Sequence, residues 1–282
     1  MKKLLVWQVV LFAVLFSFVT AGPASATILF QDSFEDSWSG SYAPGWVNTP
    51  YAVGPAPVAS MQQNSFGRSG SYGLTLIAES VPENWMWWSA VGVDTLPHKY
   101  MAKEYNPYVS VWHYDEVSPN VAGQVYAVPD WVNLYIGGTE DWTDVQFGGD
   151  DLAPDQYYYA TAGENSPGYE STGVDRTEGW HNLKFALSAV DGRIHFFVDG
   201  TEVGASYRDD YTNLGTSIGL YTFFNPELSE WGSDRPYTLW DDMEIGFHAQ
   251  VQQVPEPSTI LLLGCGLAGL GAAARRRTAR KG

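Results

Sequence analysis

The stretch that most constrains the fold is LKFALSAVDGRIHFFVDGTEVGAS, residues 183–206. Apolar and polar residues alternate along it, which is the period of a half-buried β-strand. Two Asp-Gly pairs, Asp191-Gly192 and Asp199-Gly200, interrupt the alternation. Asp-Gly between alternating runs is the strongest short-range signal for a β-hairpin. The stretch therefore predicts a meander of antiparallel strands joined by two tight turns.

The remaining chain between residues 27 and 253 has the same character. Short β-branched and aromatic runs recur between Gly, Pro, Asn and Asp, and the sequence contains no long amphipathic helical window there. A propeller is excluded because no repeat of 40 to 50 residues is present. The pattern predicts an all-β domain built as a β-sandwich or jelly roll. Strands are expected over residues 72–80, 85–93, 108–114, 131–138, 181–188, 193–200, 218–224 and 237–247.

The N-terminus has the features of a secretory signal. Lys2 and Lys3 precede the apolar run LLVWQVVLFAVLFSFV, and Ala24-Ser25-Ala26 is a small-x-small pattern that signal peptidase accepts. We expect a signal helix within residues 1–26, removed after Ala26. The alternative is a permanent N-terminal anchor, which the cleavage pattern disfavours.

The C-terminus ends in an uncharged apolar run followed by a basic cluster. Ile260 to Ala274 is 15 residues long; as a helix it covers roughly 22 Å, short of a hydrocarbon core of ~30 Å. The segment can span the membrane if the side chains of the arginines that follow extend to the membrane–water interface. The cluster from Arg275 to Lys281 should stay cytoplasmic, which places the preceding domain outside the inner membrane. We therefore expect a sandwich over 27–248, a linker over 249–259, and a transmembrane-like helix with its basic tail over 260–282.

The tripeptide Pro255-Glu256-Pro257 precedes this apolar run and the arginine cluster. Together they resemble the PEP-CTERM sorting signal of Gram-negative bacteria, over about residues 254 to 281. The resemblance implies that an exosortase-type enzyme recognises Pro-Glu-Pro and cleaves near it. It also implies an exported protein, transiently anchored in the inner membrane, that ends at the cell surface or in the extracellular matrix.

The charge between the two ends is strongly negative. Seven of the 15 basic residues and one of the 32 acids lie in the ends, which leaves 31 acids and 8 bases, a formal charge near −23. Nucleic acid is excluded as a partner, because phosphate binding depends on Lys and Arg. The single cysteine, Cys265, lies in the tail, so no disulfide holds the domain together.

The stretch EGWHNLKFALSAVDGRIHFFVDGTEVGAS resembles the laminin-G-like and concanavalin A-like jelly rolls. FQDSFEDS and LWDDMEIG resemble the first and last strands of that group and of related carbohydrate-binding modules. The resemblance implies a jelly roll from about Ile28 to Phe247. It also implies a structural Ca²⁺ between the first and last strands. Asp32, Glu35 and Asp241, with carbonyl oxygens, are the ligands we expect there, since Ca²⁺ prefers six to eight oxygens. The alternative is that they are ordinary solvated acids.

Aromatic residues make up 15% of the chain. Sugars present flat C–H faces, so a sugar site is typically a platform of exposed rings beside amides and carboxylates. The alternative for each ring is the sandwich core. The candidate polysaccharide-binding residues are Trp85, Trp87, Trp112, Trp131 and Tyr158.

Signals for catalysis are weak. The sequence lacks the Glu-x-Asp-x-x-Glu string of concanavalin-like glucanases, which sets two carboxylates on one strand face, and it lacks Gly-x-Ser-x-Gly and His-Glu-x-x-His. The sequence favours an exported, non-catalytic domain that binds carbohydrate or matrix polymer. Two alternatives stay open: a glycoside hydrolase or polysaccharide lyase on the same fold, and a purely structural surface protein.

Overall fold

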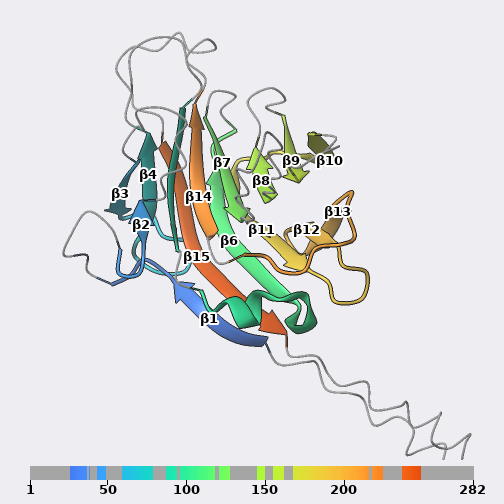
Figure 1. Ribbon diagram of the computed structural model, residues 1–282. Coiled ribbons are helices and arrows are strands. Elements are labelled where there is room, and N and C mark those ends of the chain that lie inside the picture. Colours follow the sequence, from blue (N-terminus) through green and yellow to red (C-terminus); the bar gives the residue numbers. More distant parts are fainter. Residues whose placement is uncertain are drawn as a thin grey trace, which may run out of the picture. The chain divides into compact units, whose positions relative to one another are not determined.

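Two antiparallel β-sheets make up the described part of the protein, in a computed structural model (Figure 1). The structure describes residues 26–36, 38, 43–48, 59–78, 87–93, 96–117, 121–127, 145–149, 155–161, 168–215, 218–224 and 237–248. The expected signal helix, linker, C-terminal helix and strand 131–138 lie outside these residues. Within them, no helix is long and apolar enough to cross a membrane. Residues Ala26–His248 form one compact unit.

Sheet A has eight strands and contains both the first and the last strand of the domain. Its order is β13 (Thr201–Ala205), β12 (Ile194–Val198), β11 (Gly179–Leu187), β6 (Pro107–Asp115), β15 (Tyr237–His248), β4 (Gly73–Ala78) and β3 (Ala59–Asn64), with β1 (Ala26–Asp32) paired to β15.

Sheet B has seven strands and forms the second layer. Its order is β10 (Tyr169–Asp175), β9 (Gln156–Thr161), β8 (Val145–Gly149), β7 (Val121–Ala127), β14 (Ile218–Phe224), β5 (Trp87–Val93) and β2 (Val47–Asn48). The short 3₁₀ turns η1 (His98–Met101) and η2 (Lys103–Tyr105) precede β6. The prediction of an all-β sandwich is confirmed.

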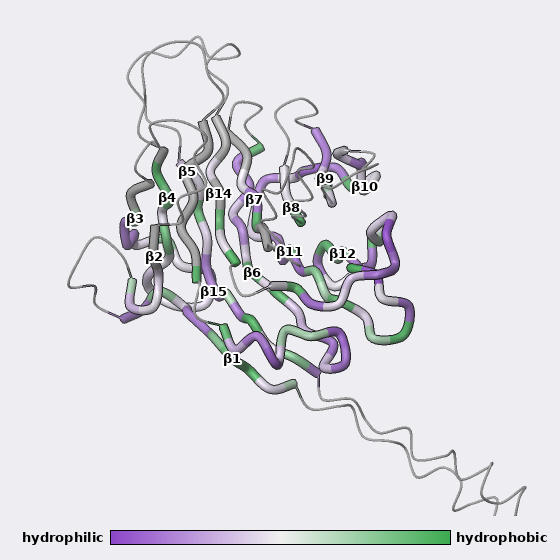
Figure 2. Tube along the Cα trace, in the orientation of Figure 1, coloured by the Kyte–Doolittle hydropathy of each residue, from purple (hydrophilic) through white to green (hydrophobic). Residues whose placement is uncertain are grey.

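The hydrophobic core lies between the two sheets. Phe196 of β12 packs against two rings of sheet B, Phe147 at 5.4 Å and Tyr159 at 4.5 Å between ring centroids. In β6, Val109 and Val111 are fully buried, whereas Ser110, Trp112 and Tyr114 are more exposed. The same alternation of burial is seen in β12, and hydrophobic and hydrophilic segments follow one another along the described strands (Figure 2). Each sheet thus has a core face and an outer face.

The β11–β12–β13 meander forms as the alternation predicts. Asp199 and Gly200 make a two-residue turn between β12 and β13, with φ of 50° and 79°. Positive φ at both central residues is what a type I′ hairpin turn requires. The expected tight turn at Asp191-Gly192 is wrong, because residues 188–193 all lie between β11 and β12. Ser188 instead accepts hydrogen bonds from the amides of Val190 and Gly192, which closes a wider turn.

Several strands carried no clear sequence signal. β3, β9 and β10 are rich in Gln, Ser and Tyr, and their apolar content is low for a strand. They pair because their neighbours in the sheet offer complementary edges, which is tertiary context that local propensity does not contain.

The two ends of the domain meet in sheet A. Ala26, after which signal cleavage is expected, is the first residue of β1, and its Cα partner is His248, the last residue of β15. Ala24, the other small residue of the expected cleavage pattern, lies outside the described residues.

Candidate functional site

The outer face of sheet B carries amides and tyrosines. Val125 of β7, Phe147 of β8 and Tyr157 of β9 belong to the core. Because side chains alternate along a strand, Gln124, Gln146 and Tyr158 lie on the opposite face. Polar side chains in the middle of a sheet, on the side away from the core, are typical of a surface that meets a ligand.

One row of this face runs from β7 to β10. The Cα partners are Gln124 with Gly148, Gly148 with Tyr158, and Tyr158 with Ser171. Gly148 leaves no side chain between the amide and the phenol. A Cβ at Gly148, whose φ is +153°, would stand 2.1 Å from the carbonyl oxygen of Gly123. Gln124 Nε2 donates to the Gly149 carbonyl at 2.7 Å, which fixes the amide on the scaffold.

The next row contains Gln146, Ala160 and Tyr169. The Tyr169 hydroxyl donates to Gln146 Oε1 at 2.6 Å, and the Tyr169 side chain is 41% exposed. Gln124 and Gln146 are only 4% and 6% exposed, so both amides lie at the buried base of this face. The face therefore combines anchored amides with tyrosine rings that solvent reaches.

This face carries no carboxylate on the described outer positions of β7, β8 and β9, which are occupied by Gln, Gly, Tyr and Ala. Retaining glycoside hydrolysis needs two carboxyl groups about 5–5.5 Å apart across the scissile bond. The arrangement can accept and donate hydrogen bonds and stack on an apolar sugar face. Sequence reasoning missed Gln124 and Gln146, although their alternation with Val, Tyr and Phe in VAGQVYA and VQFGG is a strand signal.

The predicted aromatic residues fall on both sheets. Tyr158 lies on the sheet B face, whereas Trp112 is on β6 of sheet A, with the Arg68 guanidinium 3.5 Å from its ring centroid. The structure does not bring these two together. Trp87 is the first residue of β5, with Phe224 as its Cα partner. Trp85 and Trp131 lie outside the described residues.

Each of the three carboxylates expected to bind Ca²⁺ accepts a hydrogen bond from a backbone or indole N–H group. Asp32 accepts from the amide of Phe34 and from Trp46 Nε1, both at 2.7 Å. Burial raises the pKa of Asp32. Glu35 Oε1 accepts from the Tyr72 amide at 2.8 Å.

Asp241 accepts hydrogen bonds from the loop between β3 and β4, which also contains Tyr72. It accepts from the amides of Arg68 at 2.6 Å and Ser69 at 3.3 Å, and from that of Asp242 at 2.8 Å. Burial raises the pKa of Asp241 as well. Within the described ranges, no three His, Cys, Asp or Glu side chains come together in a way that could hold a metal ion. Calcium at Asp32, Glu35 and Asp241 stays a prediction.

A buried polar cluster lies between the sheets at the end of β6. Asp115 and Arg176 form a two-bond ion pair, Nε to Oδ2 and a terminal guanidinium nitrogen to Oδ1, both 2.8 Å. Both side chains are almost fully buried. His113 stacks on Trp240 at 4.6 Å, and burial lowers its pKa to about 4. The cluster is enclosed by the core, so it supports the fold rather than meeting a ligand at the sheet B face.

Comparison with protein families matches residues 253–277 to the PEP-CTERM protein-sorting motif. The chain carries this motif at its C-terminus, which indicates an exported protein, membrane-anchored before an exosortase processes it. The sorting residues Pro255, Glu256 and Pro257 lie inside the match and outside the described residues. No curated protein sequence matches the chain.

Solved structures similar to the chain share its fold at low sequence identity. A β-glucanase from Bacillus licheniformis has a TM-score of 0.50 at 13% identity, over 80% of this chain and 99% of its own. An endo-β-1,4-glucuronan lyase from Trichoderma reesei has a TM-score of 0.51 at 13% identity, over 78% and 96%. A glycoside hydrolase family 16 endo-glucanase from Bacteroides ovatus has a TM-score of 0.51 at 11% identity, over 77% and 100%. The domain is therefore a concanavalin A-like jelly roll.

Proposed function

We propose that this exported protein binds polysaccharide without cleaving it, on the outer face of sheet B, and that it works at the cell surface or in the extracellular matrix. The observation that carries the proposal is the pair of tyrosine rings, half-buried Tyr158 and exposed Tyr169, on a face whose base is built by the buried amides of Gln124 and Gln146. It offers stacking and hydrogen bonding, but no acid pair on the described outer positions of these strands.

Three further facts support the same function. The similar structures include enzymes named for β-glucan and glucuronan, so this jelly roll is a scaffold on which other proteins handle polysaccharides. The sorting motif indicates export, and extracellular polysaccharides lie outside the cytoplasm, where an exported protein meets them. A ligand site of anchored amides and phenols on a rigid sheet needs little reorganisation on binding.

The experiment uses the full chain in detergent and affinity electrophoresis in gels that contain one polysaccharide each, with bovine serum albumin as the non-binding reference. The set includes soluble β-1,3-, β-1,4- and mixed-linkage glucans and glucuronan. We expect retardation in at least one gel. The change Tyr158→Ala should weaken that binding about tenfold, a typical loss for one well-placed contact.

The matched control is Tyr72→Ala, because Tyr72 is 43% exposed on a loop of sheet A, away from the proposed face. It should leave binding unchanged. Absence of retardation by every polysaccharide, or equal binding by Tyr158→Ala and the unmodified chain, would contradict the proposal. Release of reducing ends or of unsaturated uronate from any polymer would identify a hydrolase or a lyase instead.

A further inference from the structure

A second aromatic surface lies on the outer face of sheet A. We call it the Phe66 patch: Phe66, Tyr114, Trp180 and Tyr237. Tyr114 of β6 and Trp180 of β11 are Cα partners, and their ring centroids are 5.5 Å apart. Phe66, from the loop between β3 and β4, lies nearly parallel to Trp180 at 5.8 Å and edge-on to Tyr114 at 4.8 Å.

The patch is open to solvent although its rings are large. Phe66 is 45% exposed and Tyr237 is 38% exposed. Trp180 covers one side of the Phe66 ring, so the exposed part of Phe66 includes the opposite side. Contact between water and apolar ring surface is unfavourable in free energy. Single exposed rings are common on protein surfaces, whereas a contiguous group of exposed rings marks a binding surface.

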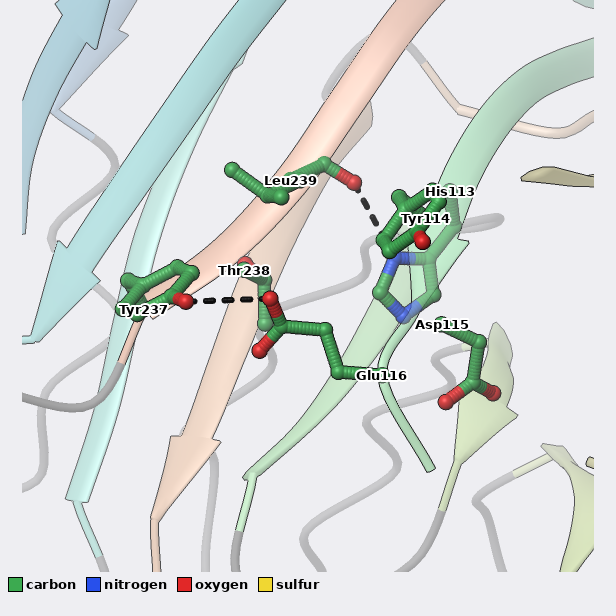
Figure 3. A pocket seen from close by; sticks show the side chains of 7 residues that line it. All are labelled: His113, Tyr114, Asp115, Glu116, Tyr237, Thr238 and Leu239. Atoms are coloured by element: carbon green, nitrogen blue, oxygen red, sulfur yellow. Dashed lines mark hydrogen bonds between the residues drawn. The ribbon is translucent and has the colours of Figure 1, made fainter. Parts of the chain in front are cut away.

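A small pocket opens beside these rings. Its lining comes from the end of β6 and the start of β15: His113, Tyr114, Asp115, Glu116, Tyr237, Thr238 and Leu239 (Figure 3). The cavity volume is about 10 Å³, close to the ~10–15 Å³ that one water needs by the same measure. The Tyr237 hydroxyl donates to Glu116 Oε1 at 3.0 Å at its rim. The pocket is the size of one hydroxyl group, not of a whole ligand.

His113 lines this pocket, but its ring turns to the core, where it stacks on Trp240. Its Nδ1 lies 3.1 Å from the Leu239 carbonyl, which can only accept, so Nδ1 carries the proton. Nε2 of the neutral ring is then an acceptor, and this buried atom has no hydrogen-bond partner among the residues that the structure describes. A Cβ on Gly123 of β7 would stand 2.7 Å from Trp240 and 2.9 Å from Nε2, so sheet B packs closely against the His113 ring on the core side. The exposed rings and Glu116 are therefore the groups that this outer face offers to a ligand.

The charges around the patch decide which polymer fits. Burial, then the negative charges of Glu178 and Glu116, raise the pKa of Tyr114, so both carboxylates act on this ring. Arg68, also on this face, is paired with Asp242 at 2.8 Å and stacked on Trp112. A polyuronate would meet these carboxylates and a domain with a formal charge near −23, whereas sugar hydroxyls would find acceptors.

We propose that the Phe66 patch and its pocket form a second polysaccharide site, which takes an uncharged hexose polymer. The rings stack on the C–H faces of the sugar, and Glu116 at the rim of the pocket accepts hydrogen bonds from its hydroxyls. The two outer faces lie on opposite sides of the sandwich, so one molecule holds two polymer strands. The proposal of this second site does not depend on the sheet B site. The proposal of cross-linking needs both sites, so it also rests on the proposed function.

Affinity electrophoresis of the full chain in detergent tests the site with three variants. Phe66→Ala removes the exposed ring, Glu116→Gln keeps the shape but removes a charge, and Tyr72→Ala is an exposed-ring control outside the patch. In a gel with soluble β-glucan, Phe66→Ala should bind about tenfold more weakly and Tyr72→Ala unchanged. Glu116→Gln should weaken binding to the β-glucan, because an amide replaces a carboxylate acceptor, and neither chain should bind a polyuronate. Equal binding by Phe66→Ala and the unmodified chain overturns the proposal, as does tight binding of polyuronate by the unmodified chain.

A clumping assay with β-glucan-coated beads tests cross-linking and separates the two sites. The unmodified chain should clump the beads, and either Phe66→Ala or Tyr158→Ala should abolish clumping while leaving residual binding. If Tyr158→Ala removes all binding and Phe66→Ala removes none, the proposal of a second site at the Phe66 patch is wrong and the proposed function is supported. If only Phe66→Ala weakens binding, the patch stands and the sheet B site fails. A dimer in sedimentation that Phe66→Ala dissociates, without glycan, would make the patch a contact between copies and overturn the proposal.

Discussion

His113 combines a packing role with a titration that should be visible in stability. Burial lowers its pKa to about 4, and Asp115, Arg176 and His181 act on it with smaller effects. The folded state keeps the ring neutral, while the unfolded state takes up a proton near pH 6.5. The unfolded state therefore binds more protons between these values, and stability falls as pH falls through this window.

We expect the free energy of unfolding to drop by roughly 3 kcal/mol from pH 7.5 to pH 4, which is the pKa difference converted at 1.36 kcal/mol per unit. Urea unfolding at a series of pH values measures it. In His113→Gln the loss of stability between pH 7.5 and pH 4 should be smaller than in the unmodified chain by about this amount. His195, whose pKa is raised by Glu202 and Asp191 against its burial, acts with the opposite sign but equally in both chains. An identical slope in both chains would contradict this account of His113.

The loop between β3 and β4 is fastened by acids that are far away in sequence. Asp241 on β15 accepts the amides of Arg68 and Ser69, while Asp242 accepts from the side chains of the same two residues. The sequence suggested acids at both ends of the domain, and that much was predictable. Their partners were not, because the bonds join residues about 170 positions apart. The hairpin at Asp199-Gly200 was predictable because all of its determinants are local.

Removing Asp241 should release this loop. In Asp241→Ala, the amides of Arg68 and Ser69 lose their acceptor, so their hydrogen exchange should speed up at least tenfold, while β12 and β11 stay protected. Asp242→Ala is the matched control, since it removes only the side-chain bonds and should leave both amides slow. Hydrogen exchange with mass spectrometry of peptides that cover residues 65–72 measures the difference. Equal exchange in the two variants would show that Asp241 does not fasten the loop.

For the whole molecule, destination and binding are encoded in separate parts of the chain. The sorting motif is contiguous and could be identified from the sequence alone, whereas the amide face of sheet B is assembled from three strands and became visible only in the fold. Glu256→Ala should therefore leave a folded domain on an unprocessed chain. Immunoblots of membrane and medium fractions should show the full-length form retained in the membrane, and Ser258→Ala should process normally. Normal release of Glu256→Ala would contradict the role of the tripeptide.

The pairing of β1 with β15 also determines when sheet A can be completed during export. β1 emerges first from the secretion channel, but its partner residues, Met243 to His248, emerge more than 200 positions later. β15 also pairs with β4 and β6, so sheet A has a gap in its middle until that strand arrives. Pairing over such separations is slow and leaves strand edges exposed. We therefore expect sheet A to close only after β15, which lies directly before the sorting motif, has left the channel, so that folding of the domain and its membrane anchoring coincide late in export.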